Sequence, residues 1–287
     1  MKQWARLIMI GACLGSSAAE AQTTLDKSKY GYSYFTLGLE NVVYEELFPG
    51  LDSDASVVSP VLNTGGLYHI NTRFDFSIDA LATFSPISAT EEWHKSGTLI
   101  QTNQFEYLKA ATNILLHYKL QDNWRVLAGT SLSYQTYKRY GLKNHNGYLN
   151  DVFREGNTWE EKSTDIFLDA GLAYDSGHLY GESDWRVSGR WVFGVPIWSV
   201  TENSRFEDIQ FNDFGFRTNA EATLSYQIMP GLHLGWFVML GYEKRFESDP
   251  QRVSYTTASG VEKQGQAWLP EAQTWTLNTG LQALWNF

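Results

Sequence analysis

Apolar and polar residues alternate along this chain with a period of two, and this constrains the fold more than any other feature. The clearest stretch runs from Phe216 to Ile228, where uncharged and mostly apolar residues alternate with polar ones. A β-strand places successive side chains on opposite faces, whereas a helix would scatter these residues around its circumference. The stretch therefore predicts a strand with one face in an apolar environment and the other in a polar one.

The same alternation recurs along the chain and predicts ten strands. They cover residues 30–44, 57–70, 73–84, 108–118, 124–134, 165–174, 185–195, 216–228, 232–242 and 274–287. Each is long enough for the roughly 9–11 tilted residues that a membrane strand needs. The pattern predicts an all-β fold, a transmembrane antiparallel up-and-down β-barrel. Twelve strands are the alternative, because residues 139–162 or 247–272 could hold another hairpin.

The connections between the predicted strands alternate in length. Short ones lie near Asn71, at 121–123, at 175–184 and at 229–231, and long ones span 45–55, 85–101, 139–162, 201–212 and 247–272. Outer-membrane barrels have short periplasmic turns and longer extracellular loops, so we expect both chain termini on the periplasmic side. A soluble β-sandwich also has alternating strands, but the apolar faces here carry no charge in their middles.

The first 21 residues have the features of a cleaved export signal. Lys2 and Arg6 precede an apolar run at 7–15, and Ala19-Glu20-Ala21 fits an A-x-A cleavage site. We therefore expect a mature chain of residues 22–287 that forms one barrel domain. Its only cysteine, Cys13, would leave with the signal peptide, which excludes disulfides and thiolate chemistry.

Charge argues against one class of partner. Removing Lys2, Arg6 and Glu20 leaves 20 basic and 31 acidic residues, a net charge of −11. A chain this acidic is a poor binder of nucleic acid.

The C-terminal strand carries apolar residues on one face, ending in Trp285 and Phe287. This ending resembles the terminal-strand signal of bacterial outer-membrane proteins, which the barrel-assembly machinery reads. The resemblance implies Trp285 and Phe287 as the assembly signal. It also implies a Gram-negative outer membrane, with its lipid and lipopolysaccharide, as the surroundings.

Two subfamilies share features with the predicted barrel. Its strand count and size are similar to those of the omptin proteases, which place paired Asp residues and an Asp–His pair at the extracellular rim. This sequence has no matching motif. Residues 278–287 resemble the end of autotransporter translocator barrels. Only residues 22–29 precede the first predicted strand, so we expect no passenger.

The polar faces of the predicted strands carry balanced charge. The basic residues there are Arg73, Lys109, Arg125, Arg186, Arg190, Arg217 and Arg245, and the acidic ones are Glu40, Asp75, Asp79, Asp165, Asp169, Glu221 and Glu243. Side chains nearly fill a barrel of this size, and a confined charge is costly unless it is paired. We therefore expect a salt-bridged, closed lumen. The alternative is a narrow channel for small solutes, lined by rings of charge.

Few residues suggest catalysis or a cofactor. The chain lacks the usual hydrolase, zinc-protease and phosphate-binding motifs, so we expect no cofactor and no metal. Asp75 and Asp79 stand about 13 Å apart along a strand, too far for a direct acid–base pair, and the same holds for Asp165 and Asp169. His69, His117, His178 and His233 fall at the periplasmic end, and His94 and His145 fall in extracellular loops.

The predicted extracellular loops are acidic, and residues 91–94 (Glu-Glu-Trp-His) form their most chemically dense segment. The sequence predicts a structural or surface-interaction role through these loops, with no ligand indicated. The two alternatives are the narrow channel and a surface enzyme with an active site at the rim.

Overall fold

The computed structural model describes residues 31–148, 158–177, 179, 183–206, 209–212, 214–256 and 262–286. The predicted signal peptide, His178 and Phe287 lie outside the described residues. No helix in the described part of the chain is long and apolar enough to cross a membrane.

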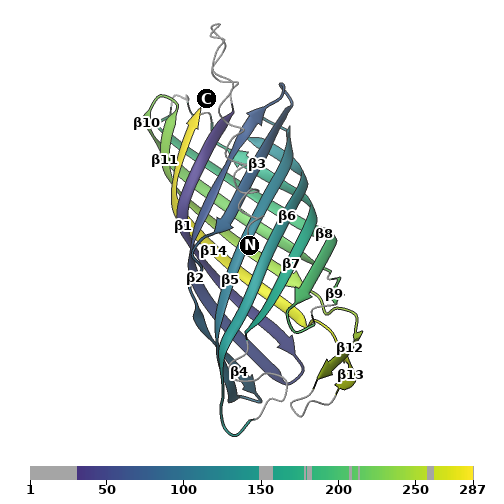
Figure 1. The fold of residues 1–287 in the computed structure, drawn as a ribbon. Coiled ribbons are helices and arrows are strands. Elements are labelled where there is room, and N and C mark those ends of the chain that lie inside the picture. The colour runs from purple at the N-terminus through teal and green to yellow at the C-terminus, as the bar shows by residue number, and fades with distance from the viewer. Residues whose placement is uncertain are drawn as a thin grey trace, which may run out of the picture.

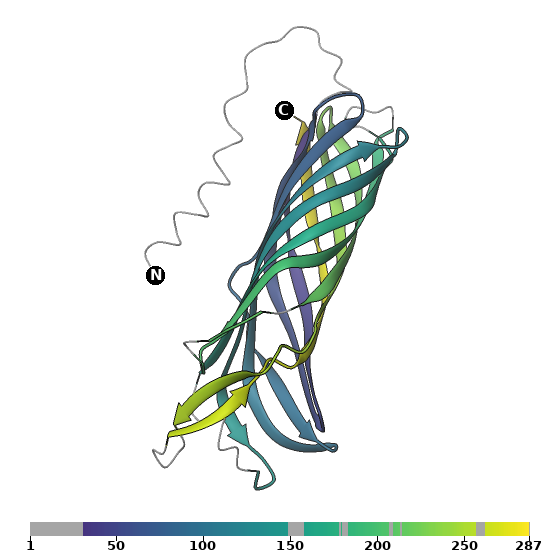
Figure 2. The same cartoon turned by 90° about the vertical axis from the view of Figure 1, so that its right-hand side faces the viewer.

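Ten antiparallel strands close into a single ring (Figures 1 and 2). In ring order they are β1 (Tyr32–Phe48), β14 (Glu271–Asn286), β11 (Leu232–Arg245), β10 (Gly215–Met229), β8 (Trp185–Asn203), β7 (Trp159–Asp175), β6 (Trp124–Asn144), β5 (Thr98–Lys119), β3 (Phe74–Thr83) and β2 (Leu51–His69). β2 pairs with β1 and closes the ring. The predicted all-β barrel of ten strands is confirmed.

Within the described residues, four short strands lie outside this ring. β4 (Ala89–Lys95) pairs with β2 and β5, and β9 (Gln210–Phe211) pairs with β8. β12 (Gln251–Thr256) and β13 (Glu262–Ala267) form a two-stranded sheet of their own. A hairpin does occupy residues 247–272, but it leaves the ring at ten strands.

The two ends of the barrel differ. We call one of them the turn end. It holds Tyr32, Asn286 and the connections β2–β3, β5–β6, β7–β8 and β10–β11. The opposite end, which holds β4, β9, β12 and β13, is called the loop end; it is the lower end in Figure 1. At the loop end several strands extend far past the stretches that alternate in the sequence.

The connection predicted at 45–55 is therefore wrong as a long loop. β1 continues to Phe48, β2 begins at Leu51, and the hairpin turns at Gly50 with a φ of 76°. Likewise β5 begins at Thr98 and β6 runs to Asn144. In these extensions both faces of the wall carry polar residues, so the alternation that marks the lipid-facing part of a strand disappears from the sequence.

The outer surface carries a belt of exposed apolar side chains between two zones of aromatic contacts. The belt includes Phe35, Leu37, Leu39, Ile114, Leu116, Leu132, Leu168, Trp191, Leu224, Leu234, Trp236 and Leu281. Ring contacts at its turn end join Phe74 to Tyr118, Trp124 to Tyr174 and Trp185 to Tyr226, with centroids 5.0–5.4 Å apart. Amphipathic aromatic rings favour such positions at membrane–water interfaces.

A second row of aromatic rings bounds the belt toward the loop end. Phe193, Phe216, Tyr242 and Trp275 follow one another across β8, β10, β11 and β14 at centroid distances of 4.4–5.8 Å. Outward ion pairs begin beyond this row, with Lys244 Nζ 2.8 Å from Glu271 Oε1 and Lys162 Nζ 2.9 Å from Glu160 Oε2. Charged side chains are costly against hydrocarbon, so these pairs lie beyond the apolar belt.

Candidate functional site

At the turn end of the lumen, Asp75 joins three cationic or titratable groups. Its carboxylate lies 2.9 Å from Lys119 Nζ, 2.9 Å from His69 Nδ1 and 3.3 Å from Arg125 Nε. Asp75 and Arg125 were predicted to face the lumen. Lys119 and His69 were missed, because each stands at the last residue of a strand, next to the turn.

A second pair at this end joins β8 to β7. Arg186 Nη2 lies 2.6 Å from Asp175 Oδ2, and its Nε lies 3.0 Å from Asp175 Oδ1. The guanidinium also stands over the ring of Tyr32 at 4.7 Å. The sequence predicts Asp175 in a turn, whereas it is the last residue of β7 and completes a two-point contact of the kind that Arg and carboxylates favour.

Arg190 occupies the middle of the lumen between two carboxylates. Its Nη1 lies 2.5 Å from Asp79 Oδ2, and its Nε lies 2.9 Å from Glu221 Oε1. Tyr34 donates a hydrogen bond from its hydroxyl to Asp79 at 2.6 Å. The predicted residues Asp79, Arg190 and Glu221 are thus brought together by β3, β8 and β10.

Arg217 is packed tightly beside this group. Its Nη2 lies 3.1 Å from Asp169 Oδ2, and its guanidinium lies 4.2 Å from the centre of the Phe167 ring. Ser131 donates to the same carboxylate at 2.6 Å. Gly194 leaves the space for this contact, since a Cβ there would stand 2.3 Å from Asp169 Oδ1.

Toward the loop end, Lys109 and Glu243 meet at 3.3 Å. Gln135 also donates from Nε2 to Glu243 at 2.7 Å. Glu40 is nearly fully buried and accepts a hydrogen bond from Thr83 at 2.9 Å. Neutral donors thus supplement the single lysine at this level.

Asp165 and Arg245 lie nearer the loop end. Asp165 accepts hydrogen bonds from Ser163 at 3.0 Å and from Ser199 at 2.5 Å. Arg245 forms an ion pair with Glu161. Sequence reasoning missed Glu161 because it lies in a strand extension that was read as loop.

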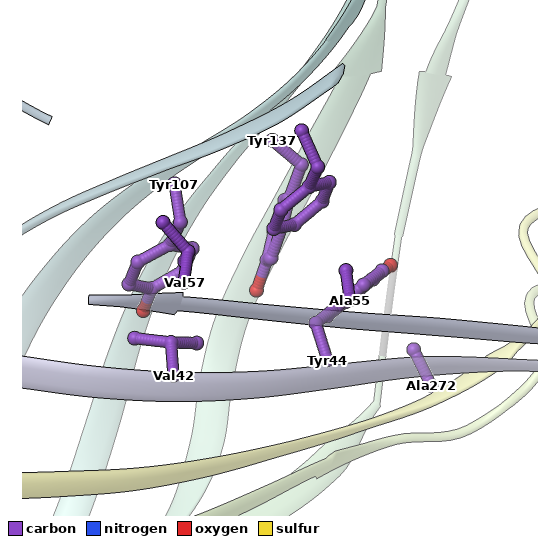
Figure 3. Close-up of a cluster of buried hydrophobic side chains, with 8 residues drawn as sticks. Val42, Tyr44, Ala55, Val57, Tyr107, Tyr137 and Ala272 are labelled. Atoms are coloured by element: carbon purple, nitrogen blue, oxygen red, sulfur yellow. The ribbon is translucent and has the colours of Figure 1, made fainter. Parts of the chain in front are cut away.

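Eight buried apolar side chains fill the lumen at the start of the loop end (Figure 3). They are Val42, Tyr44, Ala55, Val57, Phe105, Tyr107, Tyr137 and Ala272. The rings of Tyr44 and Tyr137 approach to 4.5 Å, and Tyr107 and Tyr137 both donate to Gln135 Oε1. We call this set the aromatic cluster. The same side chains on the outer face would be unremarkable, but inside a barrel they exclude water.

Arg139 lies against the aromatic cluster on its loop-end side. It makes two hydrogen bonds to Glu91, at 2.7 Å from Nε and 2.9 Å from Nη2, and its Nη2 lies 2.9 Å from Glu46 Oε1. The guanidinium also lies 5.5–5.6 Å from the ring centres of Tyr44, Trp93 and Phe105. Glu91, from the segment expected to form a dense loop, is fully buried on β4.

The pKa of Glu46 shows which effect dominates in this group. Burial by itself would raise the pKa of the carboxyl. The guanidinium groups of Arg139 and Arg245, together with a hydrogen bond from Tyr44, outweigh burial and hold the pKa below its usual value. The carboxylate is therefore charged at neutral pH and paired.

Several of these contacts join strands that are not neighbours in the ring. Asp79 and Arg190 connect β3 to β8, Lys109 and Glu243 connect β5 to β11, and Glu46 and Arg139 connect β1 to β6. Neighbouring strands stand about 4.8 Å apart, so a contact between distant strands has to cross the lumen. Such contacts occur at three successive levels.

Of the predicted lumen residues, Arg73 alone stands elsewhere. It lies exposed in the turn between β2 and β3, not on a strand face. Its backbone N–H donates a hydrogen bond to Asn71 Oδ1 at 2.8 Å and not to a neighbouring strand. The alternation in the sequence continues one residue beyond the start of β3, at Phe74, so it predicts Arg73 on the strand although Arg73 belongs to the turn.

The described histidines take separate partners. His117 Nε2 lies 2.9 Å from Ser77 Oγ, and His233 Nε2 lies 3.0 Å from the carbonyl oxygen of Leu179. At the loop end, His145 Nε2 lies 2.9 Å from Thr102 Oγ1, and His94 Nε2 lies 3.7 Å from Glu92 Oε2. Within the described residues, no group of three or more potential ligands is arranged to hold a metal ion.

Small polar cavities remain between the charge clusters. One, bordered by Asp79, Arg190 and Tyr34, leaves about 60 Å³ for solvent, and another, bordered by Glu40, Lys109 and Asn278, leaves about 40 Å³. A larger cavity of about 460 Å³ lies at the turn end, where Asp75 and Arg125 border it. A water molecule needs roughly 10–15 Å³ of such space, so the two inner cavities hold only a few waters each.

No protein-family model and no curated protein sequence matches this chain. Among solved structures, the crystal structure of the outer membrane protease OmpT from Escherichia coli is similar. It has a TM-score of 0.62 and 11% sequence identity, over 93% of this chain and 99% of that chain. This chain folds as a bacterial outer-membrane β-barrel. At this level of identity, the likeness concerns the fold alone.

Two autotransporter domains superpose on this outer-membrane barrel less well. The β domain of the Bordetella autotransporter BrkA gives a TM-score of 0.41 at 11% identity, over 90% of this chain and 100% of that chain. The translocator domain of NalP from Neisseria meningitidis gives 0.38 at 11% identity, over 99% and 96%. Scores this low carry no argument about subfamily. Of the predicted assembly signal, Trp285 lies on β14 opposite Ser33 and Leu232.

Proposed function

We propose that this outer-membrane barrel is closed to solutes and acts through the surface of its loop end. In this proposal the turn end faces the periplasm and the loop end faces the outside of the cell. The lumen contacts hold the barrel rigid and sealed, so the protein works as a surface platform and not as a pore.

The observation that carries the proposal is the set of ion pairs that cross the lumen. Lys109 with Glu243, and Arg190 with Asp79, connect strands that lie far apart in the ring. A solute passing along the axis would have to break them, and breaking a buried pair by removing one partner costs about 3–5 kcal/mol. The aromatic cluster adds a water-excluding layer between these pairs and the loop end.

The loop end has the chemistry of an interaction surface. Asp52, Asp54, Glu92 and Glu202 are exposed there, and the β12–β13 hairpin extends beyond the wall (Figure 2). An acidic surface of this kind attracts divalent cations or a basic partner, and lipopolysaccharide would surround it. We also propose that β14 carries the signal for the barrel-assembly machinery through Trp285 and Phe287.

The two alternatives find less support in the geometry. A channel for small solutes needs an open path, whereas the two inner cavities are of water size. A rim enzyme needs an activated group. His94 lies 3.7 Å from Glu92, with both side chains well exposed, and His145 is engaged by Thr102. The similarity to the protease OmpT is one of fold, so it does not favour catalysis here.

Solute uptake into liposomes tests whether the lumen is closed. Proteoliposomes with the refolded, heat-modifiable barrel should not swell in isosmotic arabinose any faster than empty liposomes. As a matched control, the variant Lys109→Ala, Tyr137→Ala, Arg139→Ala, Arg190→Ala removes the three crossing cations and opens the aromatic cluster, so it should swell faster. Swelling by the wild-type protein would contradict the proposal.

The proposed orientation is tested separately by cysteine labelling in intact cells, because the only cysteine of the sequence, Cys13, lies within the predicted signal peptide. Asn146→Cys at the loop end should react with a membrane-impermeant maleimide, and Thr72→Cys at the turn end should react only after the cells are broken. The reverse result would overturn the orientation.

A further inference from the structure

The barrel wall has an interruption between β8 and β10. The two strands pair from Tyr226 and Trp185 up to Arg217 and Gly194. Further along β8, Thr201 and Glu202 pair with β9. Between these two stretches, residues 195–200 of β8 have no paired residue on that side within the described part of the chain.

The sequence of β8 suits such an interruption. Pro196 has no amide hydrogen to donate, so it is tolerated where a ladder is absent. On the other side of β8, the register with β7 shifts, because Phe167 faces Pro196 while Ile166 faces Trp198. The extra residue, Ile197, forms a bulge that bends the strand.

A cavity of about 40 Å³ lies at this interruption, bordered by Pro196 and Ser199 of β8 and by Gly215 of β10. Phe214, Phe216 and Lys244 border it from outward-facing positions, and Tyr137 of the aromatic cluster, Asp165 and Glu243 border it from the lumen side. We call this cavity the lateral notch. It has room for the end of one chain-like group and not for a whole globular ligand.

The surface around the lateral notch is strongly apolar. Phe214 is 70% exposed and Ile197 is 61% exposed, and Trp198 and Phe246 are each nearly half exposed. Full burial of one such side chain is worth about 1.5–3 kcal/mol. Burying these side chains against hydrocarbon is therefore favourable in free energy.

The lateral notch lies at the edge of the apolar belt, where membrane lipid would cover it. Phe216 belongs to the aromatic row that bounds the apolar belt, and Lys244 with Glu271 marks the polar zone just beyond. The notch is thus continuous with the surface that faces lipid chains, at the depth where chains meet head groups.

We propose that the lateral notch binds the acyl chain of a bilayer lipid. The chain lies along Ile197, Trp198 and Phe214, and its end enters the gap between β8 and β10. The aromatic cluster behind the notch stops the chain from crossing the lumen, so the site holds one lipid in place. No bond is made or broken.

Photolabelling with lipid tests the proposal on the whole folded protein. The barrel is reconstituted into phosphatidylcholine vesicles that contain a phosphatidylcholine with a diazirine on its acyl chain, then irradiated and mapped by peptide mass spectrometry. We expect labelling of the peptides that contain 195–199 and 214–216 to exceed the average for other belt peptides several-fold. Even labelling around the belt would overturn the proposal.

Two variants separate the lateral notch from the general lipid surface. Ser199→Leu fills the notch from its inner side and should reduce labelling there to the level of the other belt peptides. Ser188→Leu makes the same change on the lumen face of β8 away from the notch and should leave labelling unchanged. If Ser199→Leu does not refold, Ser163→Leu replaces it, since Ser163 also borders the notch. Full notch labelling in a folded, filled variant would contradict the site.

Discussion

Lys109 on β5 and Glu243 on β11 meet at 3.3 Å although their strands lie on different sides of the ring. Their side chains therefore span the lumen. Gln135 on β6 reaches the same carboxylate, so three strands converge on one point. This arrangement ties opposite walls together, and it predicts how the barrel responds when single contacts are removed.

Replacing Lys109 and Glu243 together should lower the free energy of unfolding by less than the sum of the two single replacements. Lys109→Met leaves the Glu243 carboxylate short of a cation, and Glu243→Gln leaves the lysine short of an anion, while the double variant leaves neither. For contacting residues such coupling amounts to about 0.5–3 kcal/mol. Urea unfolding of the four proteins in lipid measures it. Additive losses would mean that the two side chains do not interact.

Arg139→Met should destabilise the loop end by about 3–5 kcal/mol, because it leaves the buried Glu91 carboxylate without its cation and removes the ion-pair partner of Glu46. Lys138→Met is the matched control, since Lys138 forms a partly exposed pair with Glu106 on the outer face. Exposed pairs contribute about 0–1 kcal/mol. Equal losses in the two variants, measured by urea unfolding, would contradict the assigned burial.

The contribution of Glu46 should depend on pH in one direction. Its pKa is lowered in the folded barrel, so it adds stability above the pKa of the unfolded chain and loses it as pH falls through the folded value. The difference in melting temperature between wild type and Glu46→Gln should therefore be full at pH 7 and shrink below about pH 4. A difference that grew with acidity would contradict the ion pair with Arg139.

Gly194→Ala should destabilise the barrel although alanine is a conservative change. The added Cβ would stand 2.3 Å from Asp169 Oδ1 and 3.1 Å from Arg217 Nε. Overpacking of this kind costs about 1–3 kcal/mol. Gly189→Ala, on the same strand, is the control, because its nearest neighbour would be 3.3 Å away. Indistinguishable unfolding curves for the two variants would show that the Arg217 site can relax.

The lipid-facing part of each strand could be predicted because its physics is visible in a single sequence. Between water and hydrocarbon, every second residue must be apolar, and stretches such as 216–228 show this directly. The strand extensions at the loop end could not be predicted. Water lies outside the wall there, so Glu46, Glu91, Arg139 and Glu161 sit among polar residues that resemble a loop.

The alternation predicted which charged residues face the lumen, but it could not predict which residues they pair with. Strand order and register decide that Arg190 meets Asp79 and Glu221, and neither is written in local sequence. The aromatic cluster was missed for a related reason. Val42 and Tyr44 continue the inward face of β1, whose alternation in the sequence is weak, so the change from a polar to an apolar lumen went unnoticed.

The most direct test of a closed lumen is single-channel recording in planar bilayers. The refolded, heat-modifiable wild-type barrel should insert without discrete conductance steps. The variant Lys109→Ala, Tyr137→Ala, Arg139→Ala, Arg190→Ala should show steps and so prove that insertion is detectable. Discrete openings by the wild-type protein under the same conditions would show that the crossing ion pairs and the aromatic cluster do not seal the barrel.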